Sequence, residues 1–328
     1  MAIKKANELD FSNKKISMLL LARPGVGKTT LAYSAPKPLL IDLEDGVDRV
    51  EACYRNDVMT ADPNLKDKEK YHSFIKDITT EDLSNYDTII IDSLGKFIEL
   101  VTPVVIDENP VNGQKDGKTL SLKGYGAISA KVTEFIKLIK SLGKHIIFIA
   151  HVTELSDGDV VKVRVNIPGG TKDKIWDDID LGGYMTFLGK KRVICFTPTE
   201  QYDAKGTHGI TGTYDIPELR STLNGGKNED NKFLTHLFNT YIEELNTSKK
   251  TYETDKDIYD NAMKVLGKIQ IVKNVEELNS VVEEIKTTKH ALTSREELLS
   301  YVQSKALEIG AKYDKEAKCY ITTAEEGN

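Results

Sequence analysis

The segment from Ile16 to Leu31, ISMLLLARPGVGKTTL, constrains the fold more than any other part of the sequence. An apolar run enters a glycine-containing loop that ends in Gly27-Lys28-Thr29-Thr30. The apolar run suits a buried strand, the glycines let backbone N–H groups close around phosphate oxygens, and the following residues suit a helix whose positive N-terminus faces the phosphates. This order predicts a phosphate-binding loop.

One position departs from the usual pattern of such loops, G-x-x-x-x-G-K-S/T. Its first residue is Ala22 instead of glycine, and we expect little cost because Gly25 and Gly27 would lie nearest the phosphates. In the alternative interpretation, Gly-Lys-Thr forms only a turn and a helix cap. The apolar run before it and the helix-compatible LAYSA after it disfavour that alternative.

The loop predicts ATP and Mg²⁺ as cofactors. Lys28 is placed to reach the β- and γ-phosphates, and the Thr29 hydroxyl is placed to ligate Mg²⁺. The residues expected to contact the nucleotide are Pro24, Gly25, Val26, Gly27, Lys28, Thr29 and Thr30.

A second strand-like run, Pro38 to Asp42, is followed by Leu43-Glu44-Asp45-Gly46. Ligands of open α/β sheets sit at the carboxyl ends of the strands. Glu44 is therefore in the right place to face a nucleotide. The acidic residues here can equally be ordinary loop carboxylates.

A third run, Thr88 to Ile91, ends in Asp92-Ser93. This is the Walker B pattern, in which an acid at the tip of a buried strand next to the phosphate loop holds Mg²⁺, usually through water. Thr29 and Asp92 are thus the predicted metal ligands.

A fourth run, Lys144 to Ala150, ends at His151. A polar side chain at that point can touch the γ-phosphate or the attacking water, whereas a lone histidine can equally be structural. The strand-like runs alternate with helix-like segments such as 132–142. This alternation predicts an α/β fold in which helices cover a mostly parallel sheet.

Two basic segments are candidates for contacts with single-stranded nucleic acid. We predict a loop from Asp107 to Gly126, in which Lys115, Lys118 and Lys123 accompany Tyr125, an aromatic ring that can stack on a base. The alternative for this loop is a mobile surface insertion.

The second basic segment runs from Val160 to Lys172. It contains an alternating, hairpin-like stretch with Lys162 and Arg164, followed by a Pro-Gly-Gly turn.

The composition limits the partners. With 45 basic and 51 acidic residues the net charge is −6, so any contact with nucleic acid must come from local patches or from an assembled ring. Cys53, Cys195 and Cys319 show no C-x-x-C spacing, which indicates neither a metal knuckle nor a disulfide frame. No apolar run approaches the roughly 18 residues that span a bilayer. We expect no membrane contact and a cytoplasmic location.

The order GVGKTT, LIDLEDG, IIIDS, IFIAH and PGG resembles the RecA-like recombinase core. It is most similar to short phage-encoded P-loop ATPases that act in single-strand annealing and recombination. The resemblance covers roughly Ile16 to Phe196. It implies a RecA-like ATPase core, a homo-oligomer with ATP bound between neighbouring subunits, and later loops that hold single-stranded DNA.

The resemblance also implies roles for single residues. Glu44 matches the acid that activates water, Ser93 matches the serine after the Walker B acid, and His151 matches a sensor position where recombinases more often carry Gln. The predicted catalytic residues are therefore Glu44, Lys28 and His151. The chain differs from the recombinases in its acidic charge and in having no distinct N-terminal polymerisation domain, so recombinase-type filament formation stays open.

The last 80 or so residues differ in character. Asn246 to Asp257 is polar and linker-like, and three helical patterns follow, within 258–269, 278–285 and 298–309. We therefore predict two domains, an ATPase core over 1–246 and a helical module over 247–328 that binds a replication or recombination protein or serves assembly.

Three function classes fit these observations. The first is an ATP-hydrolysing protein that acts on single-stranded DNA in phage recombination, annealing or replication. The second is an ATP-switched loader that recruits a replication partner through the helical module. The third is a small-molecule phosphotransferase, which would need a basic lid over the acceptor. Only Lys190, Lys191 and Arg192 could supply that lid.

Overall fold

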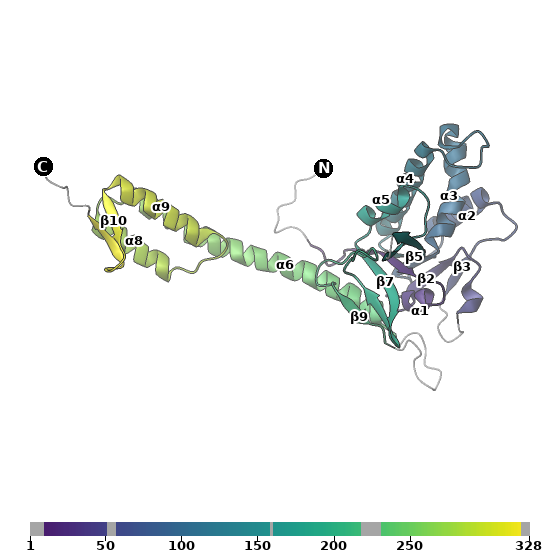
Figure 1. Cartoon of the computed structure of the whole chain (residues 1–328), viewed down its shortest axis with the longest axis horizontal. Coiled ribbons are helices and arrows are strands. Elements are labelled where there is room, and N and C mark those ends of the chain that lie inside the picture. Colours follow the sequence, from purple (N-terminus) through teal and green to yellow (C-terminus); the bar gives the residue numbers. More distant parts are fainter. Residues whose placement is uncertain (1–9, 51–56, 158–159, 218–230, 323–328) are drawn as a thin grey trace. The chain divides into compact units, whose positions relative to one another are not determined.

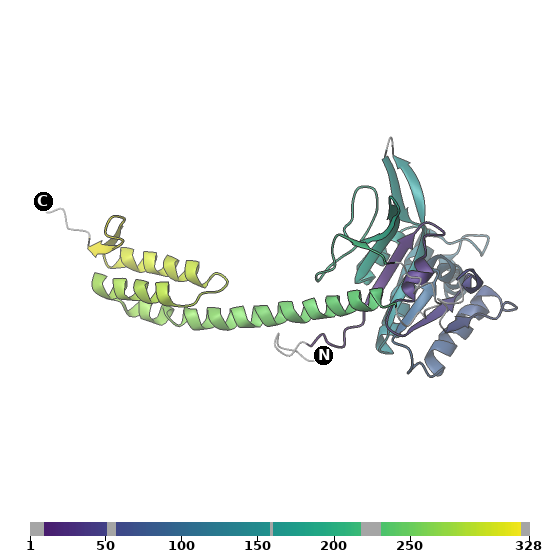
Figure 2. The same ribbon diagram turned by 90° about the horizontal axis from the view of Figure 1, so that it is seen from below.

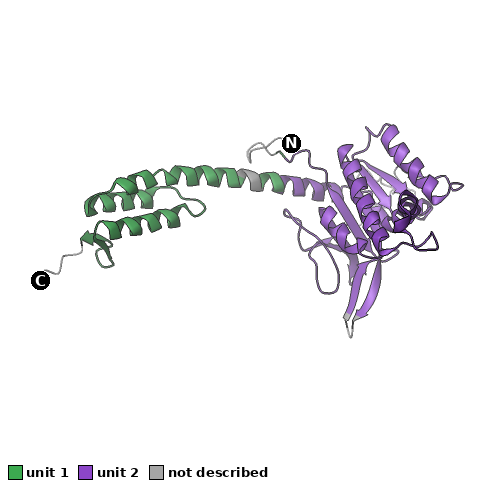
Figure 3. Cartoon of the chain, turned by 90° about the horizontal axis from the view of Figure 1, so that it is seen from above, with its two compact units in different colours: residues 1–10, 245–328 green, residues 11–244 purple. Residues whose placement is uncertain are grey.

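The computed structural model describes residues 10–50, 57–157, 160–217 and 231–322. Cys53 lies outside the described residues. The chain divides into two compact units, one formed by residues 11–244 and the other by residues 1–10 and 245–328 (Figure 3). We call them the core unit and the C-terminal unit.

Among the described residues of the core unit, a nine-stranded sheet forms the centre (Figures 1 and 2). Its strands are β1 Ser17–Ala22, β2 Pro38–Asp42, β3 Val58–Thr60, β4 Thr88–Asp92, β5 His145–Asp157, β6 Val160–Val165, β7 Leu181–Leu188, β8 Lys191–Cys195 and β9 Thr213–Asp215. The order is β3-β2-β4-β5-β1-β7-β8-β9, and β6 pairs with β5. Neighbouring strands are parallel along the stretch β3-β2-β4-β5-β1-β7. The remaining strands, β6, β8 and β9, pair antiparallel with their neighbours. The predicted α/β fold with a mostly parallel sheet is confirmed.

Helices cover both faces of this sheet. They are α1 Lys28–Ala32, α2 Asp67–Thr80, α3 Leu94–Glu108, α4 Leu122–Ser141, α5 Thr171–Asp178 and the beginning of α6 Phe233–Met263. Helices α2, α3 and α4 lie together on one face (Figure 1). There the rings of Phe97 and Phe135 are 4.8 Å apart, with Phe74 and Phe148 beside them. These rings form the centre of the main apolar core.

The beginning of α6 lies on the other face. Side chains alternate along a strand, so Ile146 and Phe148 of β5 face the main core while His145 points away from it. The His145 ring packs 5.0 Å from the ring of Phe238 in α6. Its Nδ1 accepts a hydrogen bond of 3.0 Å from the backbone N–H of Ile16.

The parallel register brings the strand ends to one edge. Ala22 at the end of β1 pairs with His151, and Asp42 at the end of β2 pairs with Asp92 at the end of β4. Asp92 in turn pairs with Ile149, two residues before His151. Residues from four neighbouring strands thus meet at the same edge of the sheet.

The predicted loop from 107 to 126 is wrong in extent. Helix α3 continues to Glu108, a 3₁₀ turn spans Pro110–Asn112, and α4 begins at Leu122. The earlier start of α4 has a capping cause, because the Ser121 hydroxyl accepts the Gly124 N–H. What remains is a tight turn closed by a bridge between Gly113 and Leu120.

The second basic segment also contains more regular structure than predicted. Strand β5 continues to Asp157 and forms an antiparallel hairpin with β6. Helix α5 begins at Thr171, so Lys172 lies on a helix. None of the predicted strand-like runs corresponds to the three-residue strand β9.

The C-terminal unit contains the end of α6, then α7 Leu266–Ile271, α8 Val275–Thr287, α9 Ser294–Glu308 and a hairpin of β10 Ala311–Asp314 with β11 Cys319–Thr322. The helical C-terminal region is confirmed. The linker predicted for Asn246 to Asp257 is wrong, because α6 runs through it. The hairpin was not predicted. None of the described helices is both long and apolar enough to cross a membrane.

His145 makes the stability of the core unit depend on pH. Burial lowers the pKa of His145 to about 4, against about 6.5 in an unfolded chain. Below pH 6.5 the unfolded chain therefore takes up a proton that the folded chain does not, and stability falls as the pH falls.

We predict that this residue accounts for a loss of about 2 kcal/mol in the free energy of unfolding between pH 7 and pH 5. Urea unfolding of the parent and of His145→Asn at both pH values measures it. Asn can still accept a hydrogen bond but does not titrate, so the variant should lose less stability on acidification than the parent does. Equal losses would contradict the assignment.

Candidate functional site

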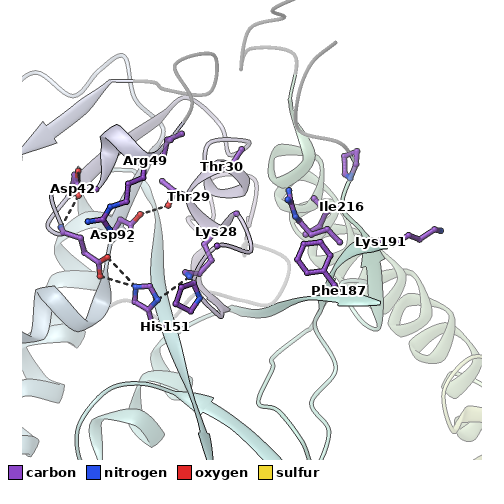
Figure 4. A pocket seen from close by; sticks show the side chains of 18 of the residues that line it. Lys28, Thr29, Thr30, Asp42, Arg49, Asp92, His151, Phe187, Lys191 and Ile216 are labelled. Atoms are coloured by element: carbon purple, nitrogen blue, oxygen red, sulfur yellow. Dashed lines mark hydrogen bonds and ion pairs between the residues drawn. The ribbon is translucent and has the colours of Figure 1, made fainter. Parts of the chain in front are cut away.

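A cavity of about 950 Å³ opens at the carboxyl ends of β1, β2 and β4 (Figure 4). The phosphate loop forms its floor. Asp42 and Asp92 lie on one side, and Phe187 and Ile216 lie across from them. The opposite wall combines these apolar side chains with the charged Lys190, Lys191, Arg192 and Asp215.

The loop has the backbone that its glycines predict. Gly25 and Gly27 have φ of 77° and 95°, in the left-handed region that favours glycine. Ala22 at the first position of the pattern is the last residue of β1 and pairs with His151, so a side chain is accommodated there.

Six of the seven predicted loop residues line the cavity, namely Pro24, Gly25, Gly27, Lys28, Thr29 and Thr30. Val26 does not, since its side chain is buried away from the cavity.

Lys28 is folded back onto its own loop. Its Nζ donates to the carbonyl oxygens of Ala22 and Arg23, at 3.2 Å each, and lies 3.5 Å from Nδ1 of His151. The side chain is only 7% exposed. Burial lowers the pKa of Lys28, while Asp92 and Glu44 oppose that change.

The two predicted metal ligands are in direct contact. The Thr29 hydroxyl donates to Asp92 at 2.7 Å. Burial raises the pKa of Asp92, and the hydrogen bond from Thr29 opposes that change. A hydroxyl and one carboxylate suit Mg²⁺, which in nucleotide sites takes few protein ligands and completes its shell with phosphate oxygens and water.

Within the described residues, no cluster of three or more His, Cys, Asp or Glu side chains could hold a metal by itself. The neighbouring Asp42 has another role. Its carboxylate accepts the backbone N–H groups of Glu44, Gly46 and Val47, which fixes the turn after β2.

Glu44 is held between two partners. The Ser93 hydroxyl donates to its carboxylate, and Nε2 of His151 lies 3.4 Å from Oε1. These contacts, His151 first, lower the pKa of Glu44 to about 2. His151 thus stands between the loop lysine and Glu44 (Figure 4), and the three predicted catalytic residues form one connected group.

The far wall of the cavity was not predicted as part of the site. Phe187 and Arg192 come from β7 and β8, and Ile216 follows β9. Arg49, in the short turn after β2, also lines the cavity. The run Lys190-Lys191-Arg192 is the one sequence signal near this wall, and by itself it suggests only a lid for a phosphate acceptor.

The candidate nucleic-acid residues lie outside this cavity. Lys115, Lys118 and Lys123 are exposed. Tyr125 is not free to stack, because it packs against the main core and against Gly169, where an added Cβ would lie 2.5 Å from the ring.

The second basic segment is partly engaged with acidic residues. Arg164 forms an ion pair of 3.4 Å with Asp203. A hydrogen bond of 3.2 Å between Ser129 and Thr171 joins α4 to the start of α5. The two basic segments also meet where Tyr125 of the first packs against Gly169 of the second.

Comparison with known proteins gives one family match. An AAA domain family, AAA_24, matches residues 14–208, more than half of the chain. No curated protein matches. Among 144 matching chains of known structure is an ATPase from the type III secretion system of pathogenic bacteria, with 13% identity and a TM-score of 0.35, covering 52% of each chain. This protein thus spans about half the length of that ATPase.

A second solved structure, described as an ATPase domain, is 14% identical, with a TM-score of 0.36, and the alignment covers 61% of this chain and 80% of that one. Both structural similarities are weak, so the assignment of the chain to a family depends on the family match alone. From the phosphate loop in its parallel sheet and the match over residues 14–208, the protein belongs to the AAA domain family AAA_24 and is a P-loop ATPase of that type.

Proposed function

We propose that the protein binds ATP with Mg²⁺ in this cavity, hydrolyses it with Glu44 as general base, and uses the cycle to act on single-stranded DNA in recombination, annealing or replication. The hydrogen bond between Thr29 and Asp92 is the observation that carries the nucleotide part. It brings the hydroxyl of the phosphate loop next to the Walker B acid, the two protein groups that would hold Mg²⁺.

The cavity suits a whole nucleotide. Its floor offers the loop and Lys28 to the phosphates, with Thr29 and Asp92 as the residues that would hold Mg²⁺. Phe187 and Ile216 offer an apolar wall on which a base can pack. Bound Mg²⁺ would neutralise charge on the phosphates during transfer.

The group of Lys28, His151 and Glu44 supports a role in sensing the nucleotide. Lys28 is bonded to two backbone carbonyls, which a γ-phosphate can replace as partners. His151 lies within 3.5 Å of both Lys28 and Glu44. Movement of Lys28 toward phosphate therefore changes the surroundings of His151, and through it those of the proposed base.

The DNA part rests on the two basic segments. Lys115, Lys118 and Lys123 are exposed, the first two in the turn before α4 and the third in its first turn, and Tyr125 of α4 packs against Gly169 of the Pro-Gly-Gly turn. From the RecA-like pattern of motifs we further propose that copies of the chain assemble with ATP between neighbours.

The alternative function, an ATP-switched loader that recruits a partner protein, is favoured by one observation. The C-terminal unit has a groove of about 660 Å³ between α8, α9 and β10. Leu307 at its rim is 81% exposed, and Tyr313 lines it as well. Arg295 and Lys312 also line it, with no carboxylate among the described lining residues. These features suit an acidic, amphipathic segment of a partner protein.

Lys28→Ala should weaken ATP binding by about 10- to 100-fold, the effect of losing one or two hydrogen bonds to a charged group. The fold should persist, because the ammonium contacts only loop carbonyls and His151. Isothermal titration with ATP, alongside thermal unfolding, measures both. Lys137→Ala, an exposed lysine on α4, is the matched control. Unchanged affinity in Lys28→Ala would remove the phosphate-loop assignment.

Glu44→Gln should leave ATP affinity within a few-fold of the parent and lower turnover by a factor on the order of 10² or more, as expected for loss of a general base. Steady-state phosphate release gives the rate. Asp45→Asn is the control, because Asp45 has a φ of 51°, a conformation that Asn also tolerates. If Asp45→Asn stopped turnover and Glu44→Gln did not, the base would be the neighbouring residue.

Replacing Lys115, Lys118 and Lys123 by Gln should flatten the salt dependence of binding to single-stranded DNA. Each phosphate contact contributes about 0.7 to the slope of log K against log salt, so three contacts predict a change of roughly two units. Fluorescence anisotropy with a labelled oligonucleotide at several salt concentrations, in the presence of a non-hydrolysable ATP analogue, measures the slope.

The control for this experiment carries the same change in charge elsewhere, at the exposed Lys76, Lys137 and Lys289. ATP binding should survive in both triple variants. If the first variant had the same salt slope as the parent protein, Lys115, Lys118 and Lys123 would not contact DNA. If the parent protein bound no oligonucleotide, the loader function would be favoured instead. The substitution Leu307→Asp would then disrupt the groove that the loader uses.

A further inference from the structure

Arg192 occupies a defined place at the wall of the cavity. It is the second residue of β8 and pairs with Phe187 of β7 in antiparallel register. Its backbone carbonyl accepts the N–H of Ile216 at 2.9 Å. The strand is therefore held on both sides, and the direction of the Arg192 side chain is set by the sheet.

The guanidinium of Arg192 packs directly against the phosphate loop of its own chain. A Cβ added to Gly27 would lie 3.3 Å from one terminal nitrogen of Arg192 and 3.4 Å from its guanidinium carbon. Gly27 directly precedes Lys28 in the sequence, and Gly27, Lys28 and Arg192 all line the cavity. The charged group is thus next to the place where the loop would bind phosphate.

The side chain of Arg192 has an unused donor there. Its Nε is buried and has no hydrogen-bond partner among the described residues. The nearby Asp215 pairs with Lys191 at 2.6 Å, and Arg192 forms no ion pair within the described part of the chain. The guanidinium carbon of Arg192 lies 5.7 Å from the centroid of the Phe187 ring, in a cation–π contact.

A buried donor without a partner is destabilising, and more so when it belongs to a charged group. An anion held in the loop would meet the terminal nitrogens beside Gly27, and a guanidinium can donate two hydrogen bonds to phosphate oxygens.

We propose that Arg192 binds the β- or γ-phosphate of the nucleotide held by the loop of the same chain, and so makes the site specific for nucleoside di- and triphosphates. The proposal rests on the function proposed above, in which the cavity holds ATP. It differs from a cation supplied by a neighbouring subunit, because Arg192 contacts Gly27 of its own chain and needs no assembly to act.

The test is isothermal titration of the full chain with ATP, ADP and AMP at fixed Mg²⁺, for the parent, Arg192→Gln and Arg192→Lys. Arg192→Gln should weaken ATP binding by about 10- to 100-fold, with less than about a twofold change for AMP, which lacks both phosphates. Arg192→Lys should be intermediate, since it keeps the charge but loses the planar fork. Equal weakening for ADP and ATP assigns the contact to the β-phosphate, and weakening for ATP alone assigns it to the γ-phosphate.

Lys137→Gln, which removes an exposed charge on α4, is the matched control and should bind all three nucleotides as the parent does. Thermal unfolding of each variant shows whether the fold is kept, and Arg192→Lys keeps the test valid if Arg192→Gln does not fold. Parental ATP affinity in both variants would overturn the proposal, and so would equal weakening for AMP and ATP. If the parent itself bound no ATP, the proposed function would fail first.

Discussion

The pairing of β1 with parallel neighbours on both sides holds the site together. All six residues of β1 are buried, and the strand pairs with β5 on one side and β7 on the other. A slip of one residue would move the phosphate loop by about 3.3 Å along the sheet and exchange the side chains that β1 presents to its two faces. The hydrogen bond of 2.7 Å between Thr29 and Asp92 would not survive such a move.

The polar groups of the site are paired with one another inside the protein. Burial disfavours the charged forms of both Lys28 and Asp92, and their mutual attraction counteracts it. Each group also has a hydrogen-bond partner inside the protein, a loop carbonyl for Lys28 and a hydroxyl for Asp92. A nucleotide would exchange these partners for phosphate and metal, so little reorganisation of the protein is needed.

Sequence reasoning located the part of the site that is local in the chain. Gly25 and Gly27 have the left-handed backbone that their loop requires, and Asp92 lies at a strand end, where a parallel sheet collects its polar residues. Arg192 and Phe187 could not be placed in this way. They reach the cavity only because β7 pairs with β1, and no pattern near residue 190 specifies that long-range pairing.

The errors elsewhere have similar causes. Polar residues between 246 and 257 suggested a linker, but a long helix can be polar on every face where it does not pack, and α6 continues through them. Tyr125 looked like an exposed stacking ring because no local pattern reveals its contact with Gly169, whose missing side chain leaves room for it. In the first case the polar residues face solvent along a helix, and in the second the contact is with a glycine distant in the sequence. Neither can be recognised from the neighbouring residues alone.

The helix after the phosphate loop depends on a segment made much later during synthesis. Helix α1 has only five residues, too few to be stable alone. At its end, the Ser34 hydroxyl accepts the N–H of Leu234, and the Ser34 carbonyl accepts the N–H of Thr235. The loop emerges early from the ribosome, yet its supporting helix is completed only when the chain has passed residue 235. Nascent chains of intermediate length therefore carry the motif without the finished site.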